Sequence, residues 1–343
     1  MTLLVRDEAD IVDAQIAYHL ATGVDFVVAT DNRSADGTTE ILERYEREGR
    51  LHLLREQGDD LRQSEWVTRM ARLAATEHGA DWVLNTDADE FWWPHGATLK
   101  DVLAAVPERF GVVRGAWRNF APRPDEGRFF AERMTARFCR PTFEDHPLGT
   151  HSKSAHRAAP DVRIGRGNHE AFAAGLVPLR GWYPIEILHF PVRSLEHCIR
   201  KYVTQFDALE RNADKGIPAH MAEAYDAWHA GRLEDFYAPL VVDDAALERG
   251  LADGTYALDT RLRDALRRLG FGEADAAVGD GSGLGDPGYA ENARFASEYS
   301  VLWESDLGLA LTERVRGLEH RVGRLERGLA TRVRGALRAG RAR

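Results

Sequence analysis

The chain has 343 residues, of which 44% are hydrophobic and 29% charged, and it contains only two cysteines, Cys139 and Cys198. This composition is typical of a globular protein, and two cysteines provide no disulfide framework, so we expect a protein of the reducing cytoplasm. Acidic residues close to the start argue against a signal peptide. The apolar runs are shorter than the roughly 20 residues that a membrane-spanning helix needs.

The charge of the chain is unevenly distributed. The net charge is -10, yet residues 312–343 contain ten arginines and three glutamates, a local balance of +7, which leaves -17 for the remainder. Binding to nucleic acid needs a basic surface on the folded body. The acidic body therefore argues against a nucleic-acid partner.

Strand and helix patterns alternate along the first hundred residues. Apolar, β-branched runs predict strands, and apolar residues at helical spacing predict helices between them. The expected strands are residues 2–5, 26–29, 51–54 and 82–86, and the expected helices are residues 7–20, 38–48 and 63–78. This alternation predicts an α/β fold with an open, mostly parallel sheet flanked by helices.

The pattern changes after about residue 105. Strand-like pieces at 111–117, 128–138 and 184–189 are separated by polar loops, and residues 194–269 are mainly helical in pattern. We therefore expect a C-terminal helical extension, followed by a glycine-rich loop and a final tail helix.

Three carboxylates follow the fourth expected strand, in Asp87-Ala88-Asp89-Glu90. Ligands of open α/β sheets bind beyond the carboxyl ends of strands, and like charges gathered there need a cation or hydrogen-bond donors. Carboxylate oxygens are ligands that Mg²⁺ and Mn²⁺ prefer, and such ions can bridge a diphosphate. The alternative interpretation is a solvated acidic turn at the end of a strand.

A second polar loop, residues 31–37, follows the second expected strand. Its Asp, Asn and Ser side chains can cap the next helix, and Gly37 allows a tight turn. Asp31 would also lie at the same sheet edge as Asp87, where it could contact a ribose or a base. The coincidence of two acidic loops at one edge favours a ligand site.

Four segments together resemble glycosyltransferase family 2, in its bacterial branch with DNxSxDGT and DxDEF motifs. They are VRDEADI at 5–11, YHL with GVD at 18–25, DNRSADGT at 31–38, and DWV at 81–83 leading to DADEF at 87–91. The resemblance continues to about residue 205 through Lys153, His169 and HFPVRSLE at 189–196. One departure is that the family usually has several more residues before the VRDE-like segment, so the first strand is short here.

The resemblance implies a GT-A fold and a nucleotide-diphosphate sugar donor, either a UDP- or a GDP-sugar. It also implies Mn²⁺ or Mg²⁺ and inverting transfer of a hexosyl unit to a hydroxyl of a glycan or lipid-linked acceptor. The metal ligands that it implies are Asp87, Asp89 and His189. The residues that it places at the nucleotide sugar are Arg6, Glu8, Asp31, Asp87 and Lys153.

Inverting transfer requires a general base, for which the sequence offers three candidates. Glu170, in Asn168-His169-Glu170, is one, and Asp145 and Glu186 are its rivals. The aromatic residues 91–93 next to the acidic motif form either an acceptor platform or part of the core. His151, His156 and His169 fall in an expected polar loop region, where a surface or hydrogen-bonded role is favoured over catalysis.

These interpretations predict four parts of the chain. Residues 1–200 would be the catalytic domain, with a nucleotide-sugar half at about 1–105 and an acceptor half at about 106–200. A helical extension at 201–275, a flexible loop region at 276–306 and a basic amphipathic tail helix at 307–343 would follow. The tail has apolar residues near heptad spacing, so it either pairs subunits in a homo-oligomer or lies on the inner face of an anionic membrane.

Two other functions remain open from the sequence. A metal-dependent nucleotidyltransferase or phosphohydrolase also gathers aspartates at strand ends. A catalytically inactive sugar-nucleotide-binding protein would be consistent with the short first strand.

Overall fold

The computed structural model describes residues 1–58, 62–95, 98–139, 152–180, 183–204, 206–207 and 219–273, together with residues 315 and 322. The chain forms two compact units, Met1–Thr142 with His151–Gly288, and Phe143–Thr150 with Tyr289–Arg343. Almost all described residues belong to the first unit. Apart from residues 315 and 322, which are helical, the predicted flexible loop and tail helix lie outside the described residues. The predicted domain boundaries and both interpretations of the tail stay predictions.

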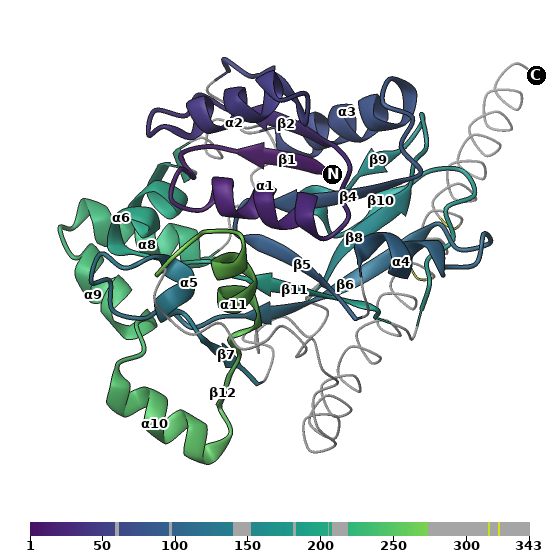
Figure 1. Ribbon diagram of the computed structural model, residues 1–343. Helices are drawn as coiled ribbons and strands as arrows, with labels where there is room; N and C mark the ends of the chain where they lie inside the picture. Colours follow the sequence, from purple (N-terminus) through teal and green to yellow (C-terminus); the bar gives the residue numbers. More distant parts are fainter. Residues whose placement is uncertain are drawn as a thin grey trace, which may run out of the picture. The chain divides into compact units, whose positions relative to one another are not determined.

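The first part of the chain alternates strands and helices as predicted (Figure 1). The elements are β1 (Thr2–Val5), α1 (Val12–Ala21), β2 (Val27–Asp31), α2 (Thr38–Arg47), β3 (Leu51–Arg55), α3 (Gln63–Thr76) and β4 (Trp82–Asp87). Strand β1 pairs in parallel with β2 and with β4, and β2 pairs in parallel with β3. Every residue of β2 is buried. Burial on both faces is the reason why β2 begins as a continuous apolar run in the sequence.

The middle of the chain completes the sheet. Its elements are β5 (Glu90–Pro94), α4 (Leu99–Ala104), β6 (Val112–Asn119), α5 (Phe130–Arg133), β7 (Ala136–Phe138), β8 (Ser152–Arg157), β9 (Arg163–Ile164), η1 (Arg166–Asn168), β10 (Ala171–Phe172) and β11 (Ile185–His189). Two predictions were wrong here. Residues 128–138 form a short helix and a three-residue strand instead of one strand. The expected polar loop around His156 contains β8, in which His156 is fully buried.

The described residues form a main sheet of eight strands in the order β3-β2-β1-β4-β8-β6-β11-β5. Only Ala88 and Asp89 separate β4 from β5, although these strands are four places apart in the sheet. Three peptide steps reach about 11 Å, whereas four strand spacings in a flat sheet span about 19 Å. The sheet therefore has to curl, which gathers the ends of several strands around the acidic motif. The predicted fold class, an open and mostly parallel α/β sheet flanked by helices, is confirmed.

Helices cover the two faces of the sheet differently. On one face, α1, α2 and α4 pack against a large core that includes Ile16, Leu42 and Leu99. On the other face, α3 packs Val67 and Met70 against Val28 of β2 and against the β9–β10 hairpin. Because consecutive strand residues point to opposite faces, neighbouring residues of β2 contribute to different cores.

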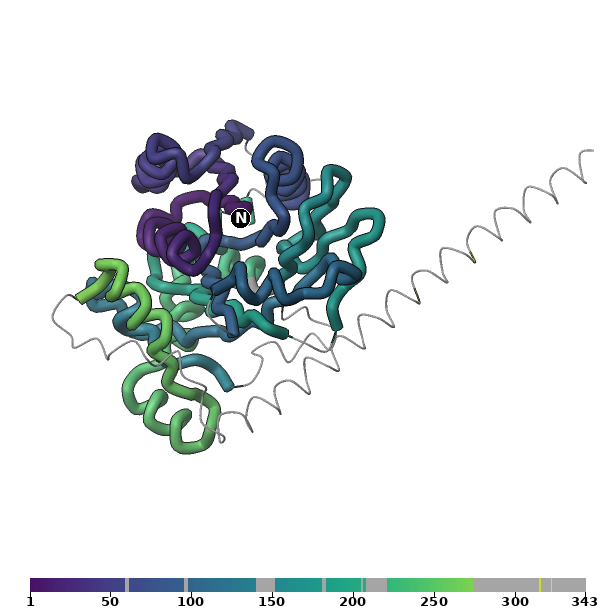
Figure 2. The backbone as a smooth tube through the Cα atoms, turned by 45° about the vertical axis from the view of Figure 1, so that its right-hand side comes forward, coloured from purple at the N-terminus to yellow at the C-terminus, as the bar shows by residue number. Residues whose placement is uncertain are grey.

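The predicted helical extension is present beyond Ser194. It comprises α6 (Leu195–Cys198), the π-helix η2 (Ile199–Thr204), α8 (Ala219–His229), α9 (Leu233–Tyr237), η3 (Ala238–Leu240), α10 (Asp244–Asp253), β12 (Tyr256–Leu258) and α11 (Arg261–Arg268). Strand β12 pairs with β7, and α11 returns beside α1 (Figure 2). Leu262 and Leu266 of α11 are buried in the main core. Among the described residues, no helix has the length and apolar character to cross a membrane.

Candidate active site

The acidic motif lies at the carboxyl end of the central sheet. Asp87 ends β4 and Glu90 begins β5. His189, the last residue of β11, is in register with Glu90 on one side and with Asn119, the last residue of β6, on the other. Three neighbouring strands therefore place Glu90, His189 and Asn119 in one row. This is the edge at which open α/β sheets bind their ligands.

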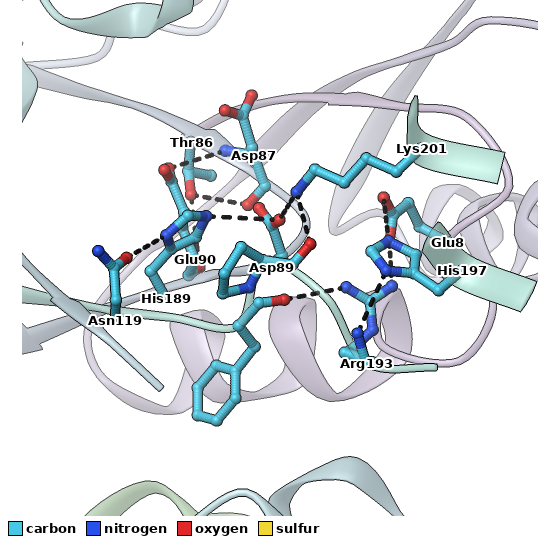
Figure 3. A network of polar contacts seen from close by, with 12 residues as sticks. Glu8, Thr86, Asp87, Asp89, Glu90, Asn119, His189, Arg193, His197 and Lys201 are labelled. Carbon is cyan, nitrogen blue, oxygen red and sulfur yellow. Dashed lines mark hydrogen bonds and ion pairs between the residues drawn. The ribbon is translucent and has the colours of Figure 1, made fainter. Parts of the chain in front are cut away.

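Asp89, Glu90 and His189 form a buried group with the ligand types of a cation site (Figure 3). Each offers one ligand atom, and these atoms lie within 4.8 Å of one another. The three residues are 4%, 0% and 8% exposed, respectively. Two buried carboxyl groups this close together require a positive charge near them.

The ring of His189 has the orientation and charge state of a metal ligand. Its Nδ1 lies 2.6 Å from Oδ1 of Asn119, and because that oxygen only accepts hydrogen bonds, Nδ1 carries the proton. Nε2 then offers its lone pair on the side of Asp89, whose Oδ2 is 3.5 Å away. Burial lowers the pKa of His189, against the attraction of Asp89, and this favours the neutral ring that binds metals.

The structure therefore brings together Asp89 and His189 of the predicted metal set and adds Glu90, which was not among the predicted ligands. Asp87, the third predicted ligand, points to other partners. The side-chain Oδ2 of Asp87 lies 2.5 Å from the ammonium of Lys153, and its Oδ1 accepts a hydrogen bond of 3.1 Å from Asn168. The position of Glu90 could have been found from the sequence only if residues 90–94 had been recognised as a strand.

Lys153 neutralises two of the carboxylates at once. Its Nζ is 2.5 Å from Asp87 Oδ2 and 3.0 Å from Glu90 Oε1, and its side chain is 2% exposed. The indole N–H of Trp117 also donates to Glu90 Oε1, at 3.1 Å. Burial raises the pKa of Glu90 to about 8, although Lys153 opposes this. Burial would lower the pKa of Lys153, but Asp87 and Glu90 raise it. At neutral pH the lysine is thus charged, and it lies between the carboxyl groups of Asp87 and Glu90.

Lys201 supplies the positive charge at Asp89, a role that no motif in the sequence indicated. This lysine lies on η2, and its ammonium donates to Asp89 Oδ2 and, at 3.0 Å, to the carbonyl of Pro191. Burial would raise the pKa of Asp89, yet Lys201 and His189 hold it well below its usual range. Lys201 is 112 residues from Asp89 in the chain, and no local pattern marks it.

Asn168 connects the segment before β10 to the acidic motif. It is fully buried, has a left-handed φ of 62°, and donates from its amide to Asp87. The Nδ1 of His169 lies 2.8 Å from the Ser152 carbonyl, and its ring contacts Trp117 edge-on at 5.5 Å between centroids. This segment therefore lies directly beside the acidic motif, and it carries the candidate base Glu170.

The two loops with predicted nucleotide contacts are joined to each other. The N–H groups of Asp7 and Ala9 donate to side-chain oxygens of the loop after β2, each at 3.0 Å, and the N–H of Glu8 donates to Thr38 at the start of α2, at 2.8 Å. Asp31 is 4% exposed, and its carboxylate accepts hydrogen bonds from the N–H of Ser34 and the hydroxyl of Thr39. The N-cap of α2 is Gly37, which has no side chain to cap the helix, and the N–H of Thr38 donates to Asp36 Oδ1 at 3.1 Å. The nucleoside contact of Asp31 stays a prediction.

Arg6 and Glu8 differ in how their side chains are held. Arg6 forms an ion pair of 3.8 Å with Asp7, and its buried Nε has no hydrogen-bond partner among the described residues. Glu8 instead accepts from Arg193, at 2.5 Å, and lies 3.7 Å from Nε2 of His197. Arg193 holds Glu8 in a structural network, whereas Arg6 keeps donor capacity for a ligand.

Arg193 ties the loop after β1 to the loop that follows β11. Its side chain is 1% exposed and forms ion pairs with Glu8 and with Asp10, at 2.5 and 2.6 Å. It also donates to the carbonyl of Phe190, the residue after His189. The arginine of the predicted HFPVRSLE segment therefore positions the strand end that carries His189.

The three candidate bases have different surroundings. Glu186 lies on β11 three residues before His189, so its side chain points to the opposite face of the sheet. Its carboxylate is 2.5 Å from Arg118 and 2.8 Å from Arg261, and despite burial these arginines lower its pKa. Glu170 makes no side-chain hydrogen bond or ion pair within the described part of the chain. Asp145, like His151, lies outside the described residues.

The aromatic residues after the acidic motif belong to the core. Phe91, Trp92 and Trp93 are 0%, 0% and 6% exposed in β5. Tyr18 of α1 contacts the rings of Phe91 and Trp93, and its hydroxyl donates to the Trp92 carbonyl. Buried rings cannot stack on a sugar, so the core interpretation is correct and the acceptor platform is excluded for these residues.

A groove of about 990 Å³ runs along the outer side of α3, beside the β9–β10 hairpin. Trp66, Arg72 and Phe172 are among the residues that line it, and none of the residues of the acidic motif does.

The sequence of the chain is similar to a glycosyltransferase family along its first third. The family model for glycosyltransferase family 92 matches residues 4–110. A glycosyltransferase family 92 protein of Oryza sativa subsp. japonica is 32% identical over 122 residues, which are 35% of this chain and 20% of that protein. The chain thus spans about a fifth of the length of this relative. The family that matches is 92, and membership of family 2 stays a prediction.

Solved structures with a partial likeness include TarS of S. aureus. One TarS structure has a TM-score of 0.33 and 15% identity and covers 67% of this chain and 42% of TarS. The structure of TarS 1–349 in complex with UDP has a TM-score of 0.32 and 14% identity and covers 67% of this chain and 71% of that chain. TM-scores this low do not show a shared fold, so the architecture above rests on its own strand pairing.

The similarity to family 92 covers part of the acidic site. The matched segment contains Asp31, Asp87, Asp89 and Glu90. Lys153, His189 and Lys201, which complete the cluster, lie beyond it. The chain is therefore similar to glycosyltransferase family 92 in the segment that carries its acidic motif, and the tertiary structure adds the residues that surround this motif.

Proposed function

We propose that the chain is a metal-dependent glycosyltransferase that transfers a sugar from a nucleotide-diphosphate sugar to a hydroxyl group of an acceptor. The observation that carries this proposal is the buried group Asp89, Glu90 and His189, which lies where β4 and β11 end and β5 begins. Two of these residues lie in the segment that is similar to glycosyltransferase family 92. The same function follows from the resemblance to family 2, which remains the finer proposal.

The residues of this group fit Mn²⁺ or Mg²⁺. Two carboxylates and one neutral imidazole suit Mn²⁺, and carboxylates with water suit Mg²⁺. Asn119 supplies the outer hydrogen bond that keeps Nε2 of His189 available as a ligand. A divalent cation held there would neutralise the negative charge that develops on the departing diphosphate.

Other side chains of the chain would bind and orient the donor. Lys153 and the Nε of Arg6, which makes no hydrogen bond within the described residues, are the donors proposed for the phosphates, and Asp31 is proposed to contact the nucleoside. The donor would be a UDP- or GDP-sugar and the sugar a hexose. The acceptor would be a glycan or a lipid-linked glycan, which is consistent with work at the cytoplasmic face of a membrane.

Glu170 is the base that the geometry favours for an inverting reaction. Its carboxylate has no protein partner among the described residues, and its neighbours Asn168 and His169 contact Asp87 and Trp117. A base needs a free lone pair near the acceptor oxygen, which Glu186 lacks because two arginines occupy its carboxylate.

The proposal is tested by product analysis with purified protein. Nucleotide sugars are screened by thermal shift with and without Mn²⁺, because ligands that bind only the folded state raise the melting temperature. The best donor is then incubated with glycan acceptors, and release of nucleoside diphosphate and of free phosphate is measured separately. We expect nucleoside diphosphate as the product, loss of turnover with EDTA, and recovery with Mn²⁺.

Two aspartate variants give the matched comparison. Asp89→Asn should lower turnover by roughly a thousandfold or more, because a metal ligand is lost. Asp25→Asn, which changes an exposed aspartate paired with Lys100, should leave turnover unchanged. Full activity of Asp89→Asn would disprove the proposal. Release of free phosphate or of pyrophosphate would indicate a phosphohydrolase or a nucleotidyltransferase, and tight donor binding without turnover would indicate an inactive binding protein.

A further inference from the structure

The position that a cation would take beside Asp89 is occupied by a side chain of the protein. The ammonium of Lys201 donates to Oδ2 of Asp89, the same oxygen that lies 3.5 Å from Nε2 of His189. Figure 3 shows Lys201 and His189 approaching Asp89 from opposite sides. A dication bound to Asp89 and His189 would meet the ammonium at this oxygen. Two positive charges cannot share one small buried carboxylate without strong repulsion.

Lys201 and Lys153 differ in the freedom of their side chains. Lys153 is 2% exposed and is held between two carboxylates, Asp87 and Glu90. Lys201 is 20% exposed and has one carboxylate partner, Asp89, with the Pro191 carbonyl as its second acceptor. It also lies on η2, and π-helical segments are rare and frequently occur at functional sites. Lys201 is therefore the ammonium that can leave the cluster, whereas Lys153 is fixed.

The presence of Lys201 follows from the burial of Asp89. An ionised carboxylate that is 4% exposed is costly without a counter-ion, so the protein needs a positive charge there before any metal binds. When a metal takes over that role, the displaced ammonium needs another anion. The nearest new anion at this edge would be the diphosphate of the donor, which also faces the cation.

We propose that Lys201 is the resident counter-ion of Asp89, which a divalent cation displaces when the nucleotide sugar binds and which then contacts the diphosphate. This inference rests on the proposed function and names the group that regulates its metal site. The displacement of Lys201 predicts that the binding of metal and the binding of nucleoside diphosphate are coupled. Metal alone binds weakly because it competes with the ammonium, and metal and nucleoside diphosphate favour each other's binding because the diphosphate accepts the displaced lysine.

The test measures Mn²⁺ binding, not turnover. Free Mn²⁺ is followed by electron paramagnetic resonance in titrations of the full-length protein, without nucleotide and with saturating UDP or GDP. In the wild-type protein we expect the nucleotide to lower the Kd for Mn²⁺. In Lys201→Met we expect at least about tenfold tighter Mn²⁺ binding without nucleotide and a smaller effect of the nucleotide, because the competing charge is gone.

Three further variants make the result decisive. Arg200→Met changes the adjacent residue, which pairs with Glu196 at the surface, and should behave like the wild type. Lys201→Gln removes the charge but keeps a hydrogen-bond donor on a long side chain, and it should also bind Mn²⁺ more tightly than the wild type. This variant therefore tests the inference even if Lys201→Met does not fold. Lys201→Arg keeps the positive charge and should retain weak Mn²⁺ binding.

The failure of this inference is distinguishable from failure of the proposed function. If Asp89→Asn abolishes Mn²⁺ binding but Lys201→Met and Lys201→Gln bind Mn²⁺ no more tightly than the wild type, the role of Lys201 is disproved and the metal site stands. If Asp89→Asn binds Mn²⁺ as the wild type does, or no variant binds it at all, the metal site itself is disproved and the inference falls with it.

Discussion

The ammonium of Lys153 lies 3.0 Å from Oε1 of Glu90, at a place where the lysine side chain is 2% and the glutamate side chain 1% exposed. The same ammonium is 2.5 Å from Asp87. One buried lysine thus holds together the end of β4 and the start of β5, which are separated in the sheet by three other strands. Removing its charge should affect both the stability of the fold and the binding of a donor.

Lys153→Met should lower the free energy of unfolding by about 1–3 kcal/mol, because it removes the charge-assisted hydrogen bonds of Lys153 to Asp87 and Glu90. Urea denaturation at pH 7 measures this change. Lys100→Met is the matched control, because Lys100 forms an exposed ion pair with Asp25 and should change stability by less than about 0.5 kcal/mol. Equal effects of the two variants would contradict the assigned role of Lys153.

We expect opposite effects from two glutamate variants: Glu170→Gln should mainly lower kcat, and Glu186→Gln should mainly lower the stability of the fold. Glu170 has no ion pair among the described residues, so Glu170→Gln should lower kcat by roughly a hundredfold or more with little change in melting temperature. Glu186 pairs with Arg118 and Arg261, so Glu186→Gln should destabilise the fold by about 3 kcal/mol and lower kcat far less. Steady-state kinetics and thermal denaturation of both variants check this. A large loss of kcat in Glu186→Gln alone would reverse the assignment of the base.

Arg193→Met should be among the more destabilising substitutions outside the apolar core. It would leave the carboxylates of Glu8 and Asp10 without their buried partner, at a cost of about 3–5 kcal/mol. Arg200→Met removes a partly exposed pair with Glu196 and should cost less than about 0.5 kcal/mol. Chemical denaturation distinguishes the two, and a small effect of Arg193→Met would show that the network is not needed to hold the loop after β1.

His19 should make the protein sensitive to acid. It is fully buried, its Nδ1 lies 2.7 Å from the carbonyl of Gln15, and its Nε2 accepts from the N–H of Trp92. Burial lowers the pKa of His19 to about 4, below its ordinary value of 6.5. Between about pH 6.5 and pH 4, the ring of His19 therefore carries a proton in the unfolded chain but not in the folded chain. The contribution of neutral His19 to the free energy of unfolding is fully present above pH 6.5. It is lost as the pH falls towards 4, and the total loss is about 3 kcal/mol.

This prediction is checked by how the free energy of unfolding changes with pH, and not by its value at one pH. His19→Gln should lose less stability than the wild-type protein between pH 7 and pH 4.5 in urea titrations, even if it is less stable at pH 7. His229→Gln changes an exposed histidine on α8 and should keep the wild-type slope. An unchanged slope in His19→Gln would mean that another buried group, such as His156, causes the acid sensitivity.

The sequence by itself determined the order and approximate ends of β1 to β4 and of the helices between them. Strands that are buried on both faces have to be apolar throughout, and helices that cover them have to be apolar on one side, so both are visible as local patterns. The same reasoning placed Asp87, Asp89 and His189 at strand ends. Those positions depend only on where an apolar run stops.

The tertiary structure alone decided which of these residues meet. Lys201 reaches Asp89 across 112 residues and Lys153 reaches Asp87 across 66 residues, and no local pattern specifies such contacts. The curl of the sheet placed Glu90 beside His189, turned Asp87 towards Lys153, and buried the aromatic residues of β5. The charge balance of the site depends on these long-range contacts, because a buried carboxylate is stabilised by the cation that the whole fold brings to it.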